Sequence, residues 1–259
     1  MNVKFYKYQG TGNDFIIVDN RKLSFPKNNV SLIKKLCDRR FGIGADGFIL
    51  LEKSEETDFK MIYFNADGNE SSMCGNGGRC IVAFAKKLGI IEGNTTFLAT
   101  DGLHFASIDN DIINLQMKDV RSVEIFKNHS FLNTGSPHHV TFCNTVKDLD
   151  IKKLGKKIRY GAPYFEEGTN VNFVEQISTN TFDVRTYERG VEDETLACGT
   201  GVTAVAIAAH NINKTAYNSI ILNVLGGQLE VSFNKEDNIY KNVFLKGPAQ
   251  FIFEGNIII

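Results

Sequence analysis

Two cysteines in this sequence begin the same short pattern of a cysteine, a glycine, a polar residue and a second glycine. The first copy starts at Cys74 within MCGNGGRC, and the second starts at Cys198 within ACGTG. A run of apolar and helix-forming residues follows each copy, so we expect each cysteine at a helix N-terminus. Unpaired backbone N–H groups and the helix dipole favour a thiolate there. The glycines let those N–H groups approach an anion such as a carboxylate closely.

Two such sites facing one another suggest one reaction in particular. One thiolate removes a proton from a carbon beside a carboxylate, and the opposing thiol returns a proton to the other face of that carbon. The α-proton of an amino acid is very weakly acidic, so the developing carbanion needs electrostatic stabilisation. Two helix N-termini aimed at the same carboxylate would supply it in a dry site. The pattern therefore predicts stereochemical inversion without a metal or other cofactor.

A symmetric reaction favours a symmetric protein, and the sequence contains an internal repeat. Four short segments recur in the same order at a separation of 123 or 124 residues. The matching pairs are 11–13 with 134–136, 44–46 with 168–170, 59–65 with 182–188, and 70–77 with 194–201. The chain thus consists of two copies of a unit of about 120 residues.

Short β-branched and aromatic runs bounded by Asn, Asp and Gly predict strands in both copies. Apolar helices are expected at 75–89 and 199–211, and an outer helix at 31–40. We therefore predict an α+β fold with two pseudo-symmetric halves, each a mixed or antiparallel β-sheet wrapped around a central buried helix.

The halves are expected to span residues 1–119, with Cys74, and residues 120–248, with Cys198. The apolar end of the chain, 249–259, is expected to add a buried strand that completes the first half.

Composition excludes several other functions. The 259 residues are 42% hydrophobic and 23% charged, with a formal net charge of −1, so neither nucleic acid nor a membrane surface is an expected partner. No secretory signal or membrane-spanning run is visible, so we expect a cytoplasmic protein with reduced thiols. Cys37, Cys80 and Cys143 are expected to be small buried hydrophobic residues. The largest basic cluster is spaced like a solvated helix face and consists of Lys152, Lys153, Lys156 and Lys157.

Seven segments together resemble the diaminopimelate epimerase family. FNADGNESSMCGNGGRC and YERGVEDETLACGTG are similar to its two cysteine signatures. Further matching segments are GTGNDFIIVD, GSPHHV, GTNVNFV, GGQLEV and GPAQFIFEG. The resemblance implies a pyridoxal-independent isomerase that interconverts LL- and meso-diaminopimelate, a precursor of lysine and peptidoglycan. Homodimers are common for this kind of fold, although no interface signature is visible in the sequence.

The resemblance also implies residue roles. Cys74 and Cys198 match the two acid/base cysteines. Gly75, Asn76, Gly199 and Thr200 match the family positions whose backbone amides hold the carboxylate at the reacting carbon. Residues that grip the substrate, largely at its distal amino acid centre, match Asn13, Asn65, Asn170 and Arg189. Groups that tune the cysteines or orient the substrate match His138 and Glu188. An arginine can fork onto a carboxylate, and a glutamate can accept from an ammonium.

Two positions depart from the pattern of some relatives. Ser136 stands where an asparagine often contacts substrate, and its side chain has a shorter reach. Gly47 stands where some members have glutamine, so it offers no side-chain contact.

Three other functions stay open at this stage. They are an epimerase or racemase for other amino acids, such as proline-like ones, a thiol redox protein that joins Cys74 to Cys198, and a non-catalytic binding module. Arg189 beside Glu188 favours a substrate with a second charged amino acid end, and redox motifs usually keep their cysteines close in sequence.

Overall fold

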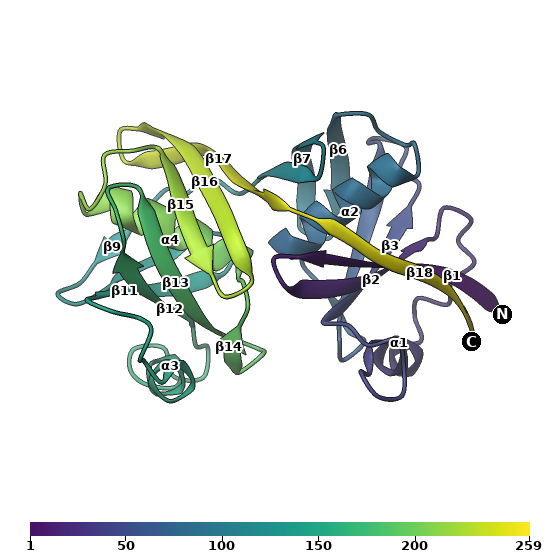
Figure 1. Cartoon of the computed structure of the whole chain (residues 1–259), viewed down its shortest axis with the longest axis horizontal. Helices are drawn as coiled ribbons and strands as arrows, with labels where there is room; N and C mark the ends of the chain where they lie inside the picture. The colour runs from purple at the N-terminus through teal and green to yellow at the C-terminus, as the bar shows by residue number, and fades with distance from the viewer. The chain divides into compact units, whose positions relative to one another are not determined.

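The computed structural model describes residues 1–259. The chain divides into two compact units, shown with their elements labelled in Figure 1. The first unit consists of Met1–Leu115 and Gly247–Ile259, and the second unit consists of Gln116–Lys246.

The first unit is a mixed sheet with two helices. Its strands pair in the order β18-β1-β2-β3-β4-β6-β7-β8, and the short β5 pairs with β4. The pairs β2–β3 and β4–β6 are parallel, and the others are antiparallel. The strand bounds are β1 (Asn2–Gly10), β2 (Asn13–Asp19), β3 (Gly47–Glu52), β4 (Phe59–Asn65), β5 (Glu70–Ser71), β6 (Asn94–Ala99), β7 (Gly102–Asp109), β8 (Ile112–Gln116) and β18 (Gln250–Ile258).

The second unit repeats this arrangement. Its strands pair in the order β9-β10-β11-β12-β13-β15-β16-β17, and the short β14 pairs with β13. Again two pairs are parallel, β11–β12 and β13–β15, at the places that correspond to β2–β3 and β4–β6. The strand bounds are β9 (Glu124–Ile125), β10 (Ser130–Asn133), β11 (Pro137–Cys143), β12 (Asn170–Gln176), β13 (Thr181–Glu188), β14 (Asp193–Thr195), β15 (Ser219–Val224), β16 (Gly227–Glu236) and β17 (Ile239–Pro248).

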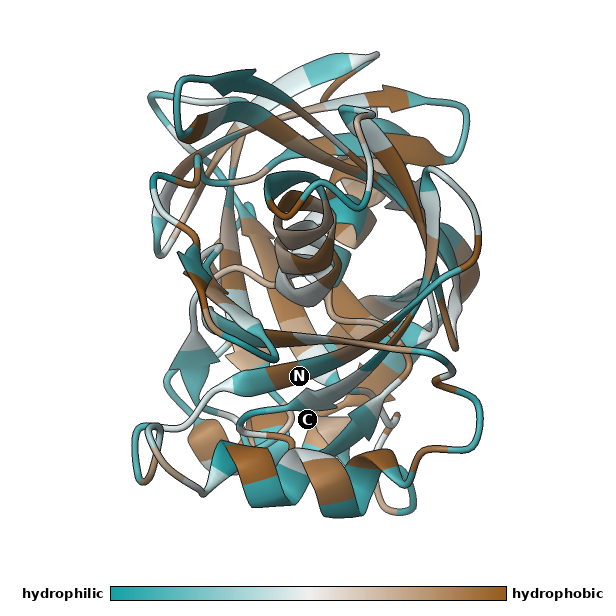
Figure 2. Cartoon of the chain, turned by 90° about the vertical axis from the view of Figure 1, so that its left-hand side faces the viewer, coloured by the Kyte–Doolittle hydropathy of each residue, from teal (hydrophilic) through white to brown (hydrophobic).

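Each unit has one central helix, α2 (Gly75–Lys87) or α4 (Gly199–Asn211). Both helices have 13 residues, of which 10 are buried. In Figure 2 a ring of strands surrounds a helix of mainly apolar colour, as a helix without a polar face requires. Parallel strand pairs need a crossover connection. The helix α2 lies in the crossover from β4 to β6, and α4 lies in the crossover from β13 to β15. The predicted α+β fold with two pseudo-symmetric halves is confirmed.

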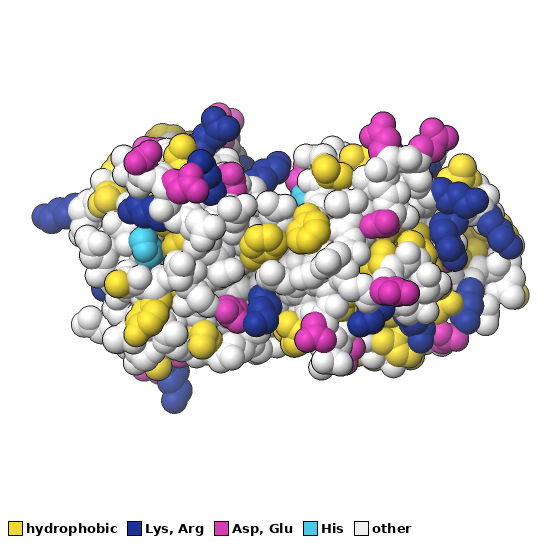
Figure 3. All heavy atoms as spheres, turned by 90° about the horizontal axis from the view of Figure 1, so that it is seen from above, with side chains coloured by type: hydrophobic (Ala, Val, Ile, Leu, Met, Phe, Trp, Pro, Cys, Tyr) yellow, Lys and Arg dark blue, Asp and Glu magenta, His cyan; other side chains and the backbone are white.

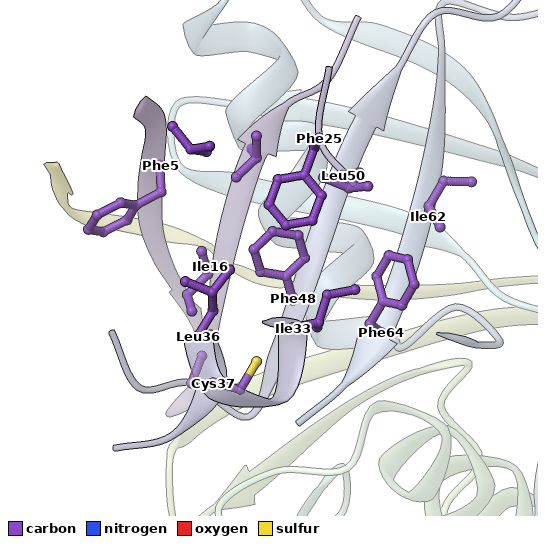
Figure 4. Packing of buried hydrophobic residues seen from close by; sticks show 13 residues of the cluster. Phe5, Ile16, Phe25, Ile33, Leu36, Cys37, Phe48, Leu50, Ile62 and Phe64 are labelled. Carbon is purple, nitrogen blue, oxygen red and sulfur yellow. The ribbon is translucent and has the colours of Figure 1, made fainter. Parts of the chain in front are cut away.

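The other two helices cover the outside of the sheets. The first, α1 (Val30–Cys37), begins at the cap Asn29, whose side chain accepts from the Leu32 N–H. Its apolar side packs on the sheet residues Phe48, Leu50 and others shown in Figure 4. Phe25 and Phe48 stack there with ring centroids 4.9 Å apart. In the second unit, α3 (Ile151–Arg159) begins at the cap Asp150, and its lysines face solvent as the sequence predicted.

Two predictions about burial need correction. The final strand β18 pairs with β1, but Phe251, Ile252 and Phe253 remain 40–51% exposed. A strand at the edge of a sheet leaves much of its surface to solvent, which explains the exposure. Cys143 is only half-buried because it is the last residue of β11, whereas Cys37 and Cys80 are buried as predicted.

None of the four helices has the length and apolar character needed to cross a membrane. On the face shown in Figure 3, acidic and basic side chains are interspersed.

Candidate active site

Each central helix begins immediately after one of the two cysteines. Cys74 is the N-cap of α2, and Cys198 is the N-cap of α4, both with extended backbone dihedrals. The carbonyl of Cys74 accepts from the Gly78 N–H at 2.7 Å, and the carbonyl of Cys198 accepts from the Val202 N–H at 2.9 Å. An N-cap side chain lies beside the helix N–H groups that have no partner within the helix. Neither cysteine side chain makes a capping hydrogen bond. Each cysteine nevertheless stands at the positive end of a helix dipole.

In the first unit, two asparagine side chains accompany Cys74. The Cys74 Sγ lies 3.8 Å from Asn13 Oδ1, where its S–H donates. The Asn76 Nδ2 donates to the same oxygen at 3.3 Å. Asn13 is the first residue of β2, and Asn76 is in the first turn of α2. The packing of the helix against β1 and β2 brings these residues together, although they are about sixty positions apart in the sequence.

Asp46 fixes the orientation of the Asn13 amide. The Asn13 Nδ2 donates to Asp46 Oδ2 at 2.6 Å, so its Oδ1 is the atom that faces Cys74. Asp46 in turn accepts from Arg39 at 2.6 Å, and Arg39 also binds Asp14 at 2.7 Å. Charged groups thus support a polar side chain at the predicted site.

In the second unit, Cys198 is buried, with 7% of its surface exposed. Its Sγ lies 3.5 Å from the hydroxyl of Thr200, which can donate to a thiolate. The backbone of Thr200 is fixed because its carbonyl accepts from the Thr134 hydroxyl at 2.8 Å. A methyl group added at Gly201 would lie 2.6 Å from Asn172 Oδ1 and 3.3 Å from the Cys198 Sγ. The severe clash is with Asn172, so glycine at this position leaves room for the side chain that contacts His138.

His138 on β11 is fully buried and oriented by one neighbour. Its Nδ1 lies 3.2 Å from Asn172 Nδ2, which is a donor, so Nδ1 accepts and the neutral ring carries its proton on Nε2. Burial, with a smaller effect from the Arg189 charge, lowers the pKa of His138 to about 3. The Nε2 atom is buried without a hydrogen-bond partner in the protein. His138 is therefore a neutral ring with one N–H donor to offer.

The remaining predicted residues of the second unit lie near the ends of strands. Asn170 Oδ1 accepts from the Arg189 backbone N–H at 2.9 Å, and its Nδ2 donates to the Pro137 carbonyl at 3.0 Å. The exposed Arg189 side chain donates one N–H to the Glu167 carbonyl at 2.9 Å, which leaves the rest of its fork for a ligand. Glu188 is half-buried at the end of β13.

Two predicted residues, Asn65 and Ser136, have no such anchoring, and Gly47 has no side chain to contact substrate. Asn65 is exposed at the end of β4, and Ser136 is half-buried just before β11. At Gly47 an added Cβ would lie 2.6 Å from the Tyr63 ring. The ring of Tyr63 thus takes the space that a longer side chain would need.

Three residues that support the site were not predicted from the sequence: Asp46, Asn172 and Arg79. Asp46 and Asn172 lie in segments that were recognised as repeats or family matches, and each orients a predicted residue. Arg79 is wholly buried in α2. A charged residue inside the otherwise apolar run after Cys74 was the available signal for it. No group of three or more His, Cys, Asp or Glu side chains is arranged to hold a metal ion.

The profile of the family described as diaminopimelate epimerase matches residues 5–120 and 130–252. A diaminopimelate epimerase of Flavobacterium psychrophilum is 64% identical over 256 residues, covering 98% of this chain and 100% of the relative. This chain belongs to the diaminopimelate epimerase family. Family membership confirms the predicted class, an isomerase that acts on an amino acid.

Solved structures of other proteins share this fold. A PhzF-family phenazine biosynthesis protein of Bacillus anthracis is similar to this chain with a TM-score of 0.79 over 100% of both chains. A hydroxyproline epimerase of Agrobacterium vitis, with bound trans-4-hydroxy-L-proline, is similar with a TM-score of 0.70. The match covers 99% of this chain and 92% of the epimerase chain. Their sequence identities of 15% and 12% mean that the likeness extends to the fold alone.

Proposed function

We propose that this member of the family interconverts LL- and meso-diaminopimelate by proton transfer to and from Cys74 and Cys198, without a cofactor. The product would serve lysine and peptidoglycan precursor synthesis. One observation carries the proposal: each of two matching units places a cysteine at the N-cap of its buried helix. Inversion at one carbon needs a base on one face and an acid on the other, and a duplicated unit provides one of each.

The first step requires that a carbanion beside the substrate carboxylate be stabilised. Backbone N–H groups of Gly75 and Asn76 from α2, and of Gly199 and Thr200 from α4, would bind that carboxylate. Hydrogen-bond donors that are already in place lose no free energy in reorganising as charge develops. Loss of one donor of this kind costs about 3–4 kcal/mol of barrier in other enzymes.

Proton transfer then follows in two halves. One cysteine, as thiolate, takes the α-proton and becomes a thiol while the C–H electron pair remains on the substrate. The other cysteine, as thiol, gives its proton to the opposite face of the carbon and becomes the thiolate. The enzyme is left ready for the reverse reaction. The contacts made by the sulfurs support both states, because Asn13 Oδ1 can accept from the Cys74 thiol and the Thr200 hydroxyl can donate to the Cys198 thiolate.

The distal end of diaminopimelate carries both an ammonium and a carboxylate. Arg189 would bind the carboxylate with its unused N–H groups, and Glu188 would accept from the ammonium. Asn13, Asn65 and Asn170 would supply the neutral polar contacts. A substrate with a single charged centre would leave Arg189 and Glu188 without their partners.

His138 would act as a neutral donor. Because burial holds its pKa at about 3, its ring carries no charge at neutral pH. Its buried Nε2 has no partner in the protein, so a substrate oxygen would satisfy it. An unsatisfied buried donor costs about 1–3 kcal/mol, and substrate binding would recover that cost.

The test is incubation of the reduced protein with LL- or meso-diaminopimelate in deuterium oxide, without pyridoxal phosphate or added metal. We expect deuterium at the α-carbon and formation of the other stereoisomer. Serine at either cysteine should reduce turnover severely, since a hydroxyl is a far weaker acid than a thiol. Absence of both exchange and inversion in folded, reduced protein would refute the proposed function.

Parallel assays separate the other candidate functions. Proline, hydroxyproline and glutamate each lack a second zwitterionic end, so we expect no turnover of these amino acids. Turnover of one of them without turnover of diaminopimelate would favour a different epimerase. Reversible thiol oxidation without any epimerisation would favour a redox protein.

A further inference from the structure

Arg79 carries a positive charge in the interior of the first unit without an acidic partner. It is 0% exposed. Its guanidinium donates to four oxygen atoms, none of which is charged: Thr11 Oγ1 at 2.8 Å, Asn76 Oδ1 at 3.0 Å, the Pro248 carbonyl at 3.3 Å and the Gly75 carbonyl at 3.4 Å. Buried arginines normally pair with a carboxylate, because a lone buried charge is costly. The hydrogen bonds of Arg79 are satisfied, but its charge is not neutralised.

The charge lies beneath the first turn of α2. Two of the four acceptors, Gly75 and Asn76, are the first two residues of that helix. The N-terminus of a helix already carries a partial positive charge. The guanidinium adds to it, so this end of α2 strongly favours a negative charge nearby.

The sulfur of Cys74 is the group placed to carry that negative charge. Burial lowers the pKa of Arg79, and negative charge on Cys80 and on Cys74 would raise it. Cys80 does not ionise, because burial raises the pKa of its thiol far above neutrality. Cys74 is only half-buried and is the helix N-cap.

The two aspartates that contact Asn13 or Arg39 are already paired. Asp14 binds Lys7 at 2.7 Å and Arg39 at 2.7 Å, and Asp46 binds Arg39 at 2.6 Å. Both aspartates are therefore neutralised by their own cations. Arg79 is the charged group whose balance depends on Cys74.

Arg79 also sets the direction of a short hydrogen-bonded chain. Its N–H donates to Asn76 Oδ1, so the Asn76 Nδ2 must point to Asn13 Oδ1, and the Asn13 Nδ2 points to Asp46. Every amide in the chain is thereby fixed in one orientation. The Asn13 oxygen faces Cys74 as a result and accepts the proton of its thiol form. This contact opposes ionisation of Cys74, so the positive charge of Arg79 has to outweigh it for the thiolate to form.

The second unit has no counterpart. The residue at the matching place of α4, 124 positions further on, is Thr203, which is fully buried and donates to the Gly199 carbonyl at 2.9 Å. A hydroxyl group bonded within its own helix adds no charge near Cys198. The two cysteines therefore differ in their surroundings, although the fold around them is duplicated.

We propose that Arg79 is a positioning residue for Cys74: its buried charge stabilises the Cys74 thiolate, and its hydrogen bonds orient the Asn76 and Asn13 amides around that sulfur. The proposal deepens the proposed function and rests on it for the catalytic meaning of the thiolate. The charge effect itself requires no substrate. It acts directly on Cys74, which belongs to the same unit as Arg79.

The experiment measures the pH dependence of alkylation by iodoacetamide for Cys74 and Cys198 in the same native sample, by peptide mass spectrometry. In the wild-type protein we expect the Cys74 pKa to lie below the ordinary value of about 8.5. Arg79→Gln keeps a donor for Asn76 but removes the charge. It should raise the Cys74 pKa by about one unit or more, which slows alkylation about tenfold at neutral pH. The Cys198 profile should shift by clearly less and serves as the internal control.

Two further variants separate charge from packing. Arg79→Lys retains the charge and should leave the Cys74 profile close to that of the wild type. Thr203→Val, at the matching place of α4, should leave both profiles unchanged. A folded Arg79→Gln protein with an unshifted Cys74 profile, or with equal shifts at both cysteines, would overturn the proposal. A Cys74 pKa at or above the ordinary value in the wild-type protein would also overturn the proposal. This measurement does not depend on whether Arg79→Gln folds. Because alkylation needs no substrate, a failure to epimerise diaminopimelate would be a separate result.

Discussion

Replacement of Gly201 by alanine should damage the site, whereas the same change at the matching Gly77 should not. Both glycines are the third residue of a central helix, and neither has a positive φ, so alanine fits the backbone at both places. The difference lies in what the new methyl group meets. At Gly201 it meets Asn172 Oδ1 at 2.6 Å and the Cys198 Sγ at 3.3 Å. At Gly77 its nearest neighbour is a methyl group of Ile49 at 3.2 Å.

The size of the effect follows from what must move. Asn172 is wholly buried and is held by the Thr186 hydroxyl, the His138 ring and the His139 carbonyl. Overpacking of this kind costs about 1–3 kcal/mol, partly offset by the helix preference of alanine, which is about 1 kcal/mol over glycine. The contact at 2.6 Å would displace Asn172 and the His138 ring that it orients, and a misplacement near 1 Å in an active site costs about a hundredfold in rate. For Gly77→Ala a shift of a few tenths of an ångström at a flexible methyl group should cost less than threefold.

The assay compares epimerisation of diaminopimelate and thermal unfolding for both variants. We expect Gly201→Ala to lose about a hundredfold in kcat with a change in unfolding free energy of no more than about 2 kcal/mol. Gly77→Ala should remain near wild type in both measurements. Equal activity in the two variants, or near-normal kcat for Gly201→Ala, would show that the position of Asn172 beside Gly201 does not control catalysis.

Two more predictions concern pH and oxidation. Burial lowers the pKa of His138 and of His139 to about 3, with smaller effects from the charges of Arg189 and His129. Above about pH 6.5 neither the folded nor the unfolded state binds a proton at these histidines. Between about pH 6.5 and about pH 3 only the unfolded state binds it. The unfolding free energy should therefore fall, as the pH is lowered through this range, by up to about 1.4 kcal/mol per pH unit for each histidine. Urea titrations at stepped pH measure this slope. His139→Gln should remove the contribution of one histidine from it. A stability that does not depend on pH would contradict the prediction. Mild oxidation should link Cys74 to Cys198 and abolish activity until a reductant is added. Mass spectrometry that finds both thiols free and activity intact after oxidation would contradict the proposal that they act at one site.

The fold could be predicted because it depends on patterns that the sequence repeats. The two cysteine motifs, each followed by an apolar run, located α2 and α4 and the cysteines that cap them. Strand identity followed from β-branched runs and turn residues, and the repeat offset supplied the two-unit organisation.

The residues that support the site could not be predicted in the same way. Asp46, Asn172 and Arg79 lie inside recognised segments, but their roles depend on partners far away in the sequence: Asp46 binds Asn13, Asn172 binds His138, and Arg79 binds Thr11. Only the packing of strands and helix reveals those partners. The exposure of β18 was missed for a related reason, since apolar composition does not tell an edge strand from a central one.

The two-cysteine mechanism is tested most directly by the position of deuterium at early times in deuterium oxide. With LL-diaminopimelate as substrate and less than a tenth converted, the meso product should carry deuterium at its inverted carbon while the recovered substrate retains protium. That outcome requires one group to take the proton and a different group to deliver the deuteron. Product that retains the original hydrogen, or recovered substrate that gains deuterium as fast as product does, would indicate a single base and contradict the roles of Cys74 and Cys198.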